Sequence, residues 1–366
     1  MAFIYILSDY GKLSKENETL LFFQDDGTKT ILFPFKTEQL VLMGNISITG
    51  GAFRLIHKYK IPITFLSSNG KFNSKLVYEE PKNIILRQRQ FNVISNKQKS
   101  LEIAGSIVLG KIKNQIAFLQ RVKRKSNNLQ VQKSISISIE QMKQKIQSIS
   151  TATDIDQLRG LEGAAARLYF SVLKYNITPD WAIFKSRSRN PPKSNVNAVL
   201  SFLYTLLMYR VSSAIESQGL DTMAGILHVI NYGRSSLVFD LMEEFRTPIA
   251  DSICCSLFNL KKLKEDDFEQ KVFSEKDENY PIKNYCDEEE NKDNISFSVE
   301  SEKGVLLTKN GLKKVVKSFE EKMDTQIFYE PLQKKISYQR IMIEQAKLYK
   351  RVILGEENKY QPYYFK

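Results

Sequence analysis

The residues best suited to chemistry lie close together in residues 219–246, which read GLDTMAGILHVINYGRSSLVFDLMEEFR. This stretch holds His228, one of two histidines in the chain, and a group of carboxylates at Asp240, Glu243 and Glu244. Carboxylate oxygens with one imidazole, and room left for water and phosphate, suit a hard divalent cation such as Mg²⁺ or Mn²⁺. The stretch is therefore a candidate metal site.

The element that must position these groups is a helix over residues 236–245. Apolar residues recur there at the spacing of a buried helical face, and Ser235 or Ser236 is a plausible N-cap. Asp240 and Glu243, three residues apart, can aim at a common point. A turn at residues 231–233 could fold His228 back toward them. The alternative is a solvated acidic face beside a structural histidine, because charged residues are mostly exposed.

A third ligand would favour the metal site, and LRGLEGAAARLYF, residues 158–170, offers one. Glycine and alanine residues around Glu162 let another helix pack closely. A bare carboxylate in such a seam must be exposed, paired or bound to a cation, since burying it alone is costly. Glu162 is the natural third ligand for the His228 and Glu243 site. A salt bridge to Arg159 is the alternative, and the residues alone leave both open.

Charge favours a polyanionic partner. Lys and Arg number 54 against 41 Asp and Glu, which gives a net charge of +13 and a sequence pI near 9.3, although a balance that serves only solubility stays open. Arg187, Arg189 and Lys193 crowd a turn made by two prolines, and such a loop suits phosphate binding. A helical stretch upstream adds basic residues that either contact phosphates or form a solvated face: Lys111, Lys113, Arg121, Lys123, Arg124 and Lys125.

One segment has the opposite charge. Residues 265–293 carry 12 acidic and 4 basic residues with little periodic hydrophobicity. Such a segment cannot bury enough apolar surface to offset its ordering entropy, so we expect a mobile loop away from the metal site. The alternative is a loop that docks on the basic surface until DNA or a partner displaces it.

Fold class follows from a change of pattern along the chain. Residues 1–85 show short apolar runs separated by turn signals, which predict an antiparallel β domain. Residues 86–366 keep helical periodicity, so we expect an α+β protein with a larger all-α catalytic domain. The three cysteines show neither zinc-finger nor disulfide spacing, and the longest apolar segment, residues 197–209, is short for a membrane span. These features favour a reducing, intracellular location.

Four ordered motifs carry a family resemblance: LRGLEGAAARLYF, RSRNPPKSNVNAVLSFLYTLL, the 219–246 stretch, and SYQRIMIEQAKLYKRVILGEENKYQPYYF. Together they resemble the CRISPR-associated integrase of the spacer-acquisition machinery, the first of the numbered Cas proteins. The resemblance implies that Glu162, His228 and Glu243 are the catalytic metal ligands and that Asp240 is a neighbouring acid. How Asp240 and Glu243 divide coordination and support stays open. It also implies phosphate contacts at Arg189 and Arg234.

The function that the resemblance implies is insertion of short DNA fragments into a CRISPR repeat array by metal-dependent transesterification. The family acts on double-stranded DNA in the prokaryotic cytoplasm, as a homodimer through the β domain and with a small companion adaptation subunit. Transesterification needs no ATP, and the sequence holds no GxxxxGK[ST] phosphate loop. Two alternatives stay open: a basic DNA-binding scaffold without catalysis, and a branched-DNA repair nuclease that uses the same residues.

Overall fold

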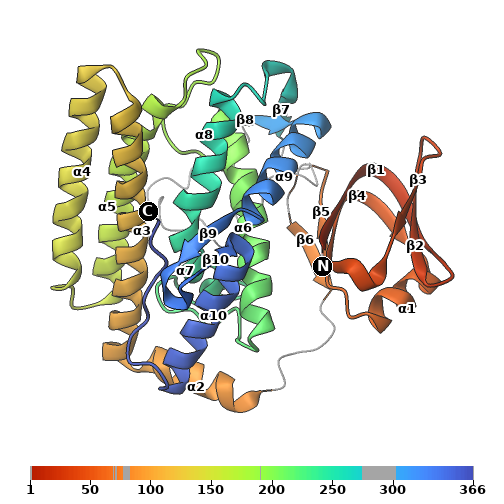
Figure 1. Cartoon of the computed structure of the whole chain (residues 1–366), viewed down its shortest axis with the longest axis horizontal. Helices are drawn as coiled ribbons and strands as arrows, with labels where there is room; N and C mark the ends of the chain where they lie inside the picture. Colours follow the sequence, from red (N-terminus) through yellow and green to blue (C-terminus); the bar gives the residue numbers. More distant parts are fainter. Residues whose placement is uncertain are drawn as a thin grey trace. The chain divides into compact units, whose positions relative to one another are not determined.

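The computed structural model describes residues 2–68, 70, 72–76, 83–189, 191–273 and 302–365. The chain forms two compact units, the first built on Met1–Lys82 and the second beginning at Asn83. Strands dominate the first unit and helices the second (Figure 1). The predicted α+β class, with a β-rich start followed by a larger helical region, is confirmed.

A six-stranded sheet forms the first unit, in the order β3-β2-β1-β4-β5-β6. Its central pairs β1–β4 and β4–β5 are parallel, whereas the other pairs are antiparallel. The sheet is mixed, so the prediction of an antiparallel sheet is wrong in this respect. The β2–β3 hairpin occupies one side of β1, which leaves the other side for β4. The strands are β1 (Ala2–Glu16), β2 (Thr19–Gln24), β3 (Lys29–Leu32), β4 (Thr37–Ile48), β5 (Ile63–Leu66) and β6 (Phe72–Leu76).

The core of the first unit lies between this sheet and α1 (Gly50–Lys58). Leu13 and Leu40 of the sheet are buried together with Leu55 and Ile56 of the helix. The helix follows β4 directly, and the hydroxyl of its N-cap residue, Thr49, accepts a hydrogen bond from the first turn.

Three long helices, α3, α4 and α5, pack against one another in the second unit (Figure 1). The longest is α3, whose buried stripe also meets α7. The helices of this unit are α2 (Ile84–Ser95), α3 (Lys97–Lys125), α4 (Leu129–Ile149), α5 (Ile155–Leu173), α6 (Asn195–Ser217), α7 (Ser236–Phe245), α8 (Ser252–Asn259), α9 (Lys309–Met323) and α10 (Tyr338–Leu354).

The helix predicted over residues 236–245 is α7, and it does not stop at Phe245. A π-helical turn, Arg246–Asp251, joins it to α8. Pro248 lies in this turn. Because proline lacks an N–H and crowds the preceding turn, it interrupts an α-helical ladder, and a wider π turn accommodates it. The turn thereby sets the direction of the Arg246 and Asp251 side chains, which lie at its two ends.

Two short pairs of strands accompany the helices, so the second unit is not all-α as predicted. They are β7 (Phe268–Phe273) with β8 (Glu302–Leu307), and β9 (Gln326–Tyr329) with β10 (Lys334–Ser337).

The acidic segment predicted as a mobile loop, residues 265–293, begins with ordered structure. Glu265–Asp267 form a 3₁₀ turn that leads into β7, and Asp267 is buried, where it accepts hydrogen bonds from Lys314 and Asn310. The prediction is wrong for residues 265–273. Residues 274–293 lie outside the described part of the chain.

The C-terminal segment, residues 360–365, packs back on α3 and α7. Buried Asn114 of α3 donates to the carbonyl of Tyr363 at 2.9 Å and accepts from the amide of Phe365 at 2.8 Å. Pro362 crosses α3 at Gly110, where an added Cβ would lie 2.5 Å from the proline ring. We call residues 360–365 the C-terminal strap.

One described helix, α6, has the length and apolar composition of a membrane span, and 72% of its most apolar window is buried inside the fold. That burial is typical of a core helix. Cys254 and Cys255 are buried free thiols in α8, in line with the predicted helical pattern without a disulfide.

Candidate active site

The candidate site is built around α7. Asp240 and Glu243 lie on it at i and i+3, and both carboxylates are buried. Their spacing suggested that both carboxylates aim at one point, but in the structure they point in different directions. Asp240 turns toward the loop that precedes the helix, whereas Glu243 turns toward α3 and α5. The imidazole of His228 lies between them.

Asp240 holds the loop of residues 226–228 with both of its oxygens. Its Oδ2 accepts from the amides of Ile226 (2.5 Å) and Leu227 (3.0 Å), and its Oδ1 accepts from the amide of His228 (2.9 Å). Three backbone donors stabilise the charge of a side chain with no exposed surface. Asp240 is thus fully occupied within the protein, and its part in metal binding stays a prediction.

Gly225 permits this close wrapping of the loop on α7. A Cβ at this position would lie 2.5 Å from the backbone carbon of Ser236 and 2.6 Å from the amide of Leu237. No real Cβ approaches backbone so closely, so any other residue would push the loop away from the helix. The predicted return of His228 toward the carboxylates is confirmed, and glycine makes it possible.

The same carboxylate sets the orientation of the imidazole. Asp240 Oδ1 lies 2.7 Å from Nδ1 of His228, so the neutral ring carries its proton on Nδ1 and leaves the Nε2 lone pair free. That Nε2 lies 3.7 Å from Oε1 of Glu243. Two acceptors therefore face each other at a distance that a shared cation can bridge.

Glu243 also faces cations on its other oxygen. Lys111 Nζ of α3 lies 2.6 Å from Oε2, and Arg246 Nε lies 3.1 Å from it. Burial would raise the pKa of Glu243, but Arg246 and Lys111 outweigh burial and lower this pKa to about 2. Glu243 is therefore an ionised carboxylate with two cations on Oε2, while its Oε1 faces the imidazole of His228.

Glu162 of α5 joins the site through Lys111. The Lys111 ammonium forms an ion pair with Glu162 as well as with Glu243, and burial, which lowers the pKa of Lys111, is outweighed by these two carboxylates, so the pKa is raised. Arg159, the partner that the sequence suggested as an alternative, pairs with Asp156. A cation does lie against Glu162, but it comes from α3 and belongs to the centre around Glu243.

No three His, Cys, Asp or Glu side chains among the described residues converge closely enough to hold a metal ion directly. At this site the Lys111 ammonium of α3 stands between Glu162 of α5 and Glu243 of α7. The loop before α7 adds the imidazole of His228, which faces the other oxygen of Glu243.

Two basic residues of this centre, Lys111 and Arg246, were not expected there from the sequence. The sequence pattern favoured either a phosphate contact or a solvated face for Lys111, yet its side chain is only 10% exposed. A signal was present: Lys111 continues the apolar stripe of Ala104, Ile107 and Val108, where a lysine requires a buried anion.

The predicted phosphate contacts fall into two groups. Arg189 and Lys193 are exposed. Arg187 instead turns inward, where it donates to Asn197 (2.9 Å) and Ser201 (3.0 Å) and where burial lowers its pKa to about 10. Arg234 is buried and lies over the ring of Phe239. Phosphate contacts at Arg187 and Arg234 stay predictions, and both side chains are engaged within the protein here.

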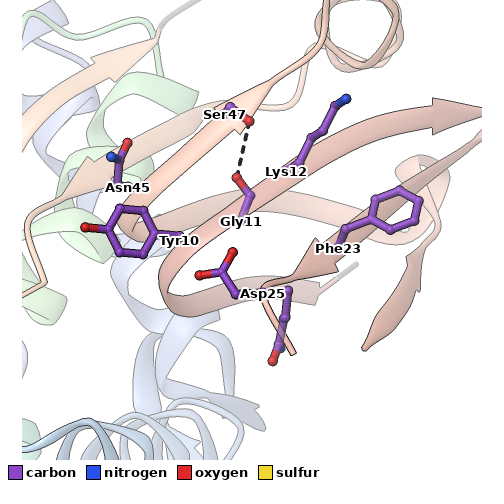
Figure 2. A pocket seen from close by; sticks show the side chains of 8 residues that line it. Tyr10, Gly11, Lys12, Phe23, Asp25, Asn45 and Ser47 are labelled. Atoms are coloured by element: carbon purple, nitrogen blue, oxygen red, sulfur yellow. Dashed lines mark hydrogen bonds between the residues drawn. The ribbon is translucent and has the colours of Figure 1, made fainter. Parts of the chain in front are cut away.

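A hollow of about 360 Å³ in the first unit offers a different chemistry. Tyr10 and Lys12 of β1, Asp25, and Asn45 of β4 are among the residues that line it (Figure 2). It brings together no histidine and no pair of carboxylates, and His57 lies exposed on α1 outside its lining. The candidate active site is therefore the centre in the second unit.

Fold and site together define a two-unit α+β protein whose helical unit carries a histidine–carboxylate centre with a buried lysine. The family model described as CRISPR associated protein Cas1 matches residues 4–274. The chain belongs to the Cas1 family.

Individual comparisons agree with this assignment. A relative from Thermus thermophilus, named CRISPR-associated endonuclease Cas1 3, is 31% identical over 98% of this chain and 96% of its own length. Two solved structures share the fold. A casposase bound to an integration product has a TM-score of 0.79 at 18% identity, covering 100% and 95% of the two chains. A Cas6-RT-Cas1–Cas2 complex has a TM-score of 0.77 at 22% identity, covering 99% of this chain and 36% of that one.

Proposed function

We propose that this chain is a metal-dependent DNA endonuclease and integrase that inserts short DNA fragments into a CRISPR repeat array. The observation that carries the proposal is the pair of His228 Nε2 and Glu243 Oε1, two acceptors 3.7 Å apart, with Glu162 joined to them through one cation. Curated relatives named endonucleases support a nuclease, and the net charge of +13 suits DNA.

The donor set fits Mg²⁺ or Mn²⁺. Two carboxylates and one imidazole nitrogen are ligands for such ions, and Oε1 of Glu243 faces the free lone pair of His228 Nε2 at 3.7 Å. Glu162, His228 and Glu243 would hold the ion, and Asp240 would orient the imidazole from behind. When bound, the ion would polarise the attacked phosphate and stabilise a 3′-hydroxyl as it becomes the nucleophile.

The reaction conserves the number and type of phosphodiester bonds. The 3′-oxygen of the incoming DNA forms a new bond to phosphorus in the repeat, and the bond from that phosphorus to the 3′-oxygen of the repeat strand breaks. One phosphodiester replaces another, and the proton of the attacking hydroxyl ends on the released 3′-hydroxyl. Glu243 is ionised throughout the neutral range, since its pKa is about 2. Neighbouring cations cause this low pKa, so the carboxylate depends on them to keep its charge near the attacked phosphate. Arg246 and Lys111 are those cations in the protein itself.

The partners follow as part of the proposal. We expect action on double-stranded DNA, as a homodimer and with the small companion subunit, in the prokaryotic cytoplasm. Structures of the same fold include one bound to an integration product and one in a complex that contains Cas2. The exposed side chains of Arg189 and Lys193 are the candidate phosphate contacts.

A strand-transfer assay tests the proposal. Protein, companion subunit, a fragment with free 3′ ends and a repeat-containing plasmid are incubated with Mn²⁺, Mg²⁺ or EDTA. We expect covalent transfer that requires the metal, and at least about a 100-fold loss in Glu162→Gln, His228→Ala and Glu243→Gln with duplex binding retained. The matched control is Glu140→Gln on the exposed face of α4. Cleavage of branched DNA without transfer would identify a repair nuclease instead, and binding without either reaction would identify a scaffold.

A further inference from the structure

Lys111 occupies a position that a surface lysine does not. Its ammonium contacts carboxylates from two different helices, Glu162 on α5 and Glu243 on α7, and its side chain is 10% exposed. It thereby joins the two helices through their acidic side chains. The two carboxylates, at 18% and 3% exposure, would otherwise repel each other in a region of low dielectric.

The two carboxylates that Lys111 contacts are already matched by two cations without any metal. Glu162 and Glu243 supply two negative charges, and Lys111 and Arg246 supply two positive ones. A divalent ion held by the same two carboxylates adds two charges beside Lys111 Nζ. Because like charges a few ångströms apart repel strongly in a desolvated site, the ion and the ammonium cannot share that space. Arg246 contacts Glu243 from the side of α7 and stacks over Tyr204 at 4.8 Å, so it can stay.

We infer that Lys111 is a built-in substitute cation, which keeps Glu162 and Glu243 in place in the metal-free protein and leaves them when a divalent ion binds. The inference rests on the proposed function and assigns a residue within its site. The flexible four-carbon side chain of lysine suits such an exchange, and a rigid bidentate guanidinium would not. Lys111 is a positioning residue: it acts on the metal ligands and competes with the ion they hold.

A purely structural salt bridge makes the opposite prediction. If Lys111 only supported the fold, its loss would disorder the ligands and weaken metal binding. If it competes with the ion, its loss removes the competitor and leaves two facing carboxylates that favour a divalent cation. Metal affinity therefore separates the two roles, whatever happens to activity.

The experiment uses the metal-stripped full chain and Mn²⁺ as the probe, with free Mn²⁺ measured by electron paramagnetic resonance. We expect Lys111→Met to bind Mn²⁺ at least about tenfold more tightly than the natural chain, a change of about 1.4 kcal/mol. In EDTA the variant should melt at a lower temperature, and saturating Mn²⁺ should raise its Tm by more than that of the natural chain. The control is Lys113→Met, an exposed lysine two residues along α3. Equal or weaker binding by Lys111→Met overturns the inference.

A measurement on the natural chain covers the case in which Lys111→Met fails to fold. Acylation by a lysine-selective reagent, read by mass spectrometry, reports how accessible each ammonium is. Reactivity of Lys111 should rise several-fold on adding Mn²⁺ while that of Lys113 stays constant, and no rise at Lys111 overturns the inference. A failure of the proposed function would give a different result. The natural chain would then show no saturable Mn²⁺ binding, or binding that Glu162→Gln does not weaken.

Discussion

Asp240 Oδ1 lies 2.7 Å from Nδ1 of His228, and the contact leaves Nε2 as the nitrogen that faces Glu243. Asp240→Asn tests this orienting role. An amide cannot accept from the loop amides and the ring N–H with both of its ends, so the ring loses its tautomer or the loop loses a hydrogen bond. We expect Mn²⁺ affinity to fall by about 10- to 100-fold, with a corresponding loss of strand transfer.

Asp156→Asn is the matched control for that experiment, because Asp156 is an acid on the α5 surface with 82% of its side chain exposed. It should bind Mn²⁺ like the natural chain. Natural affinity and transfer rate in Asp240→Asn would show that the carboxylate does not orient the imidazole.

Glu244 gives a prediction for stability against pH. It is buried, and burial raises its pKa to about 7 although Tyr363, Tyr360 and Gln345 donate hydrogen bonds to it. The ordinary value is 4.5, so between pH 4.5 and 7 the folded chain binds this proton more than the unfolded chain does. The contribution is therefore fully present below pH 4.5 and is lost as pH rises toward 7, by on the order of 3 kcal/mol.

Urea unfolding of the natural chain and of Glu244→Gln at pH 5 and pH 8 measures this contribution. Between pH 5 and pH 8 the unfolding free energy of the natural chain should fall relative to that of Glu244→Gln. An identical difference at both pH values would mean that the strap donors hold Glu244 ionised throughout.

The exposed basic loop is tested by Arg189→Ala combined with Lys193→Ala. Phosphate contacts release counterions, so the double variant should bind duplexes of every sequence more weakly, and the slope of log affinity against log salt should flatten by up to about 2. Lys133→Ala with Lys143→Ala, two exposed lysines of α4, removes the same charge elsewhere. A loss confined to one DNA sequence with an unchanged slope would mean that the loop reads bases.

The acidic segment is tested by replacing residues 274–293 with a short Gly/Ser linker. The replacement begins after Phe273 because Asp267, with Lys314 and Asn310, belongs to the folded unit. We expect unchanged DNA affinity at low salt. A clear gain in affinity would instead reveal that the segment screens the basic surface until DNA displaces it.

Local patterns predicted the local parts of the site. The spacing of apolar residues predicted α7 with the bounds that the structure has, and a turn-rich link of a few residues is enough to return His228 to it. Glu162 was suggested as a site residue because the small residues around it allow another helix to pack closely.

Long-range pairing was beyond the same reasoning. Lys111 meets Glu162 from 51 positions away, and nothing in the sequence near either residue encodes that distance. The parallel pairing of β1 with β4 depends likewise on where the β2–β3 hairpin folds. Asp240 and Glu243 share a helix face by spacing, yet their roles differ because backbone amides reach only one of them.

The C-terminal strap has a consequence for the order of synthesis. Asn114 and Phe365 are 251 positions apart. Helices α3, α5 and α7 therefore leave the ribosome before Tyr363 and Phe365, which donate hydrogen bonds to Glu244 and Asn114. Until the strap emerges, the buried amide of Asn114 and the carboxylate of Glu244 lack the hydrogen bonds that the strap supplies. A nascent chain therefore carries a candidate site whose neighbouring residues are still without the strap, so we expect the site to become fully ordered only after this segment has been translated.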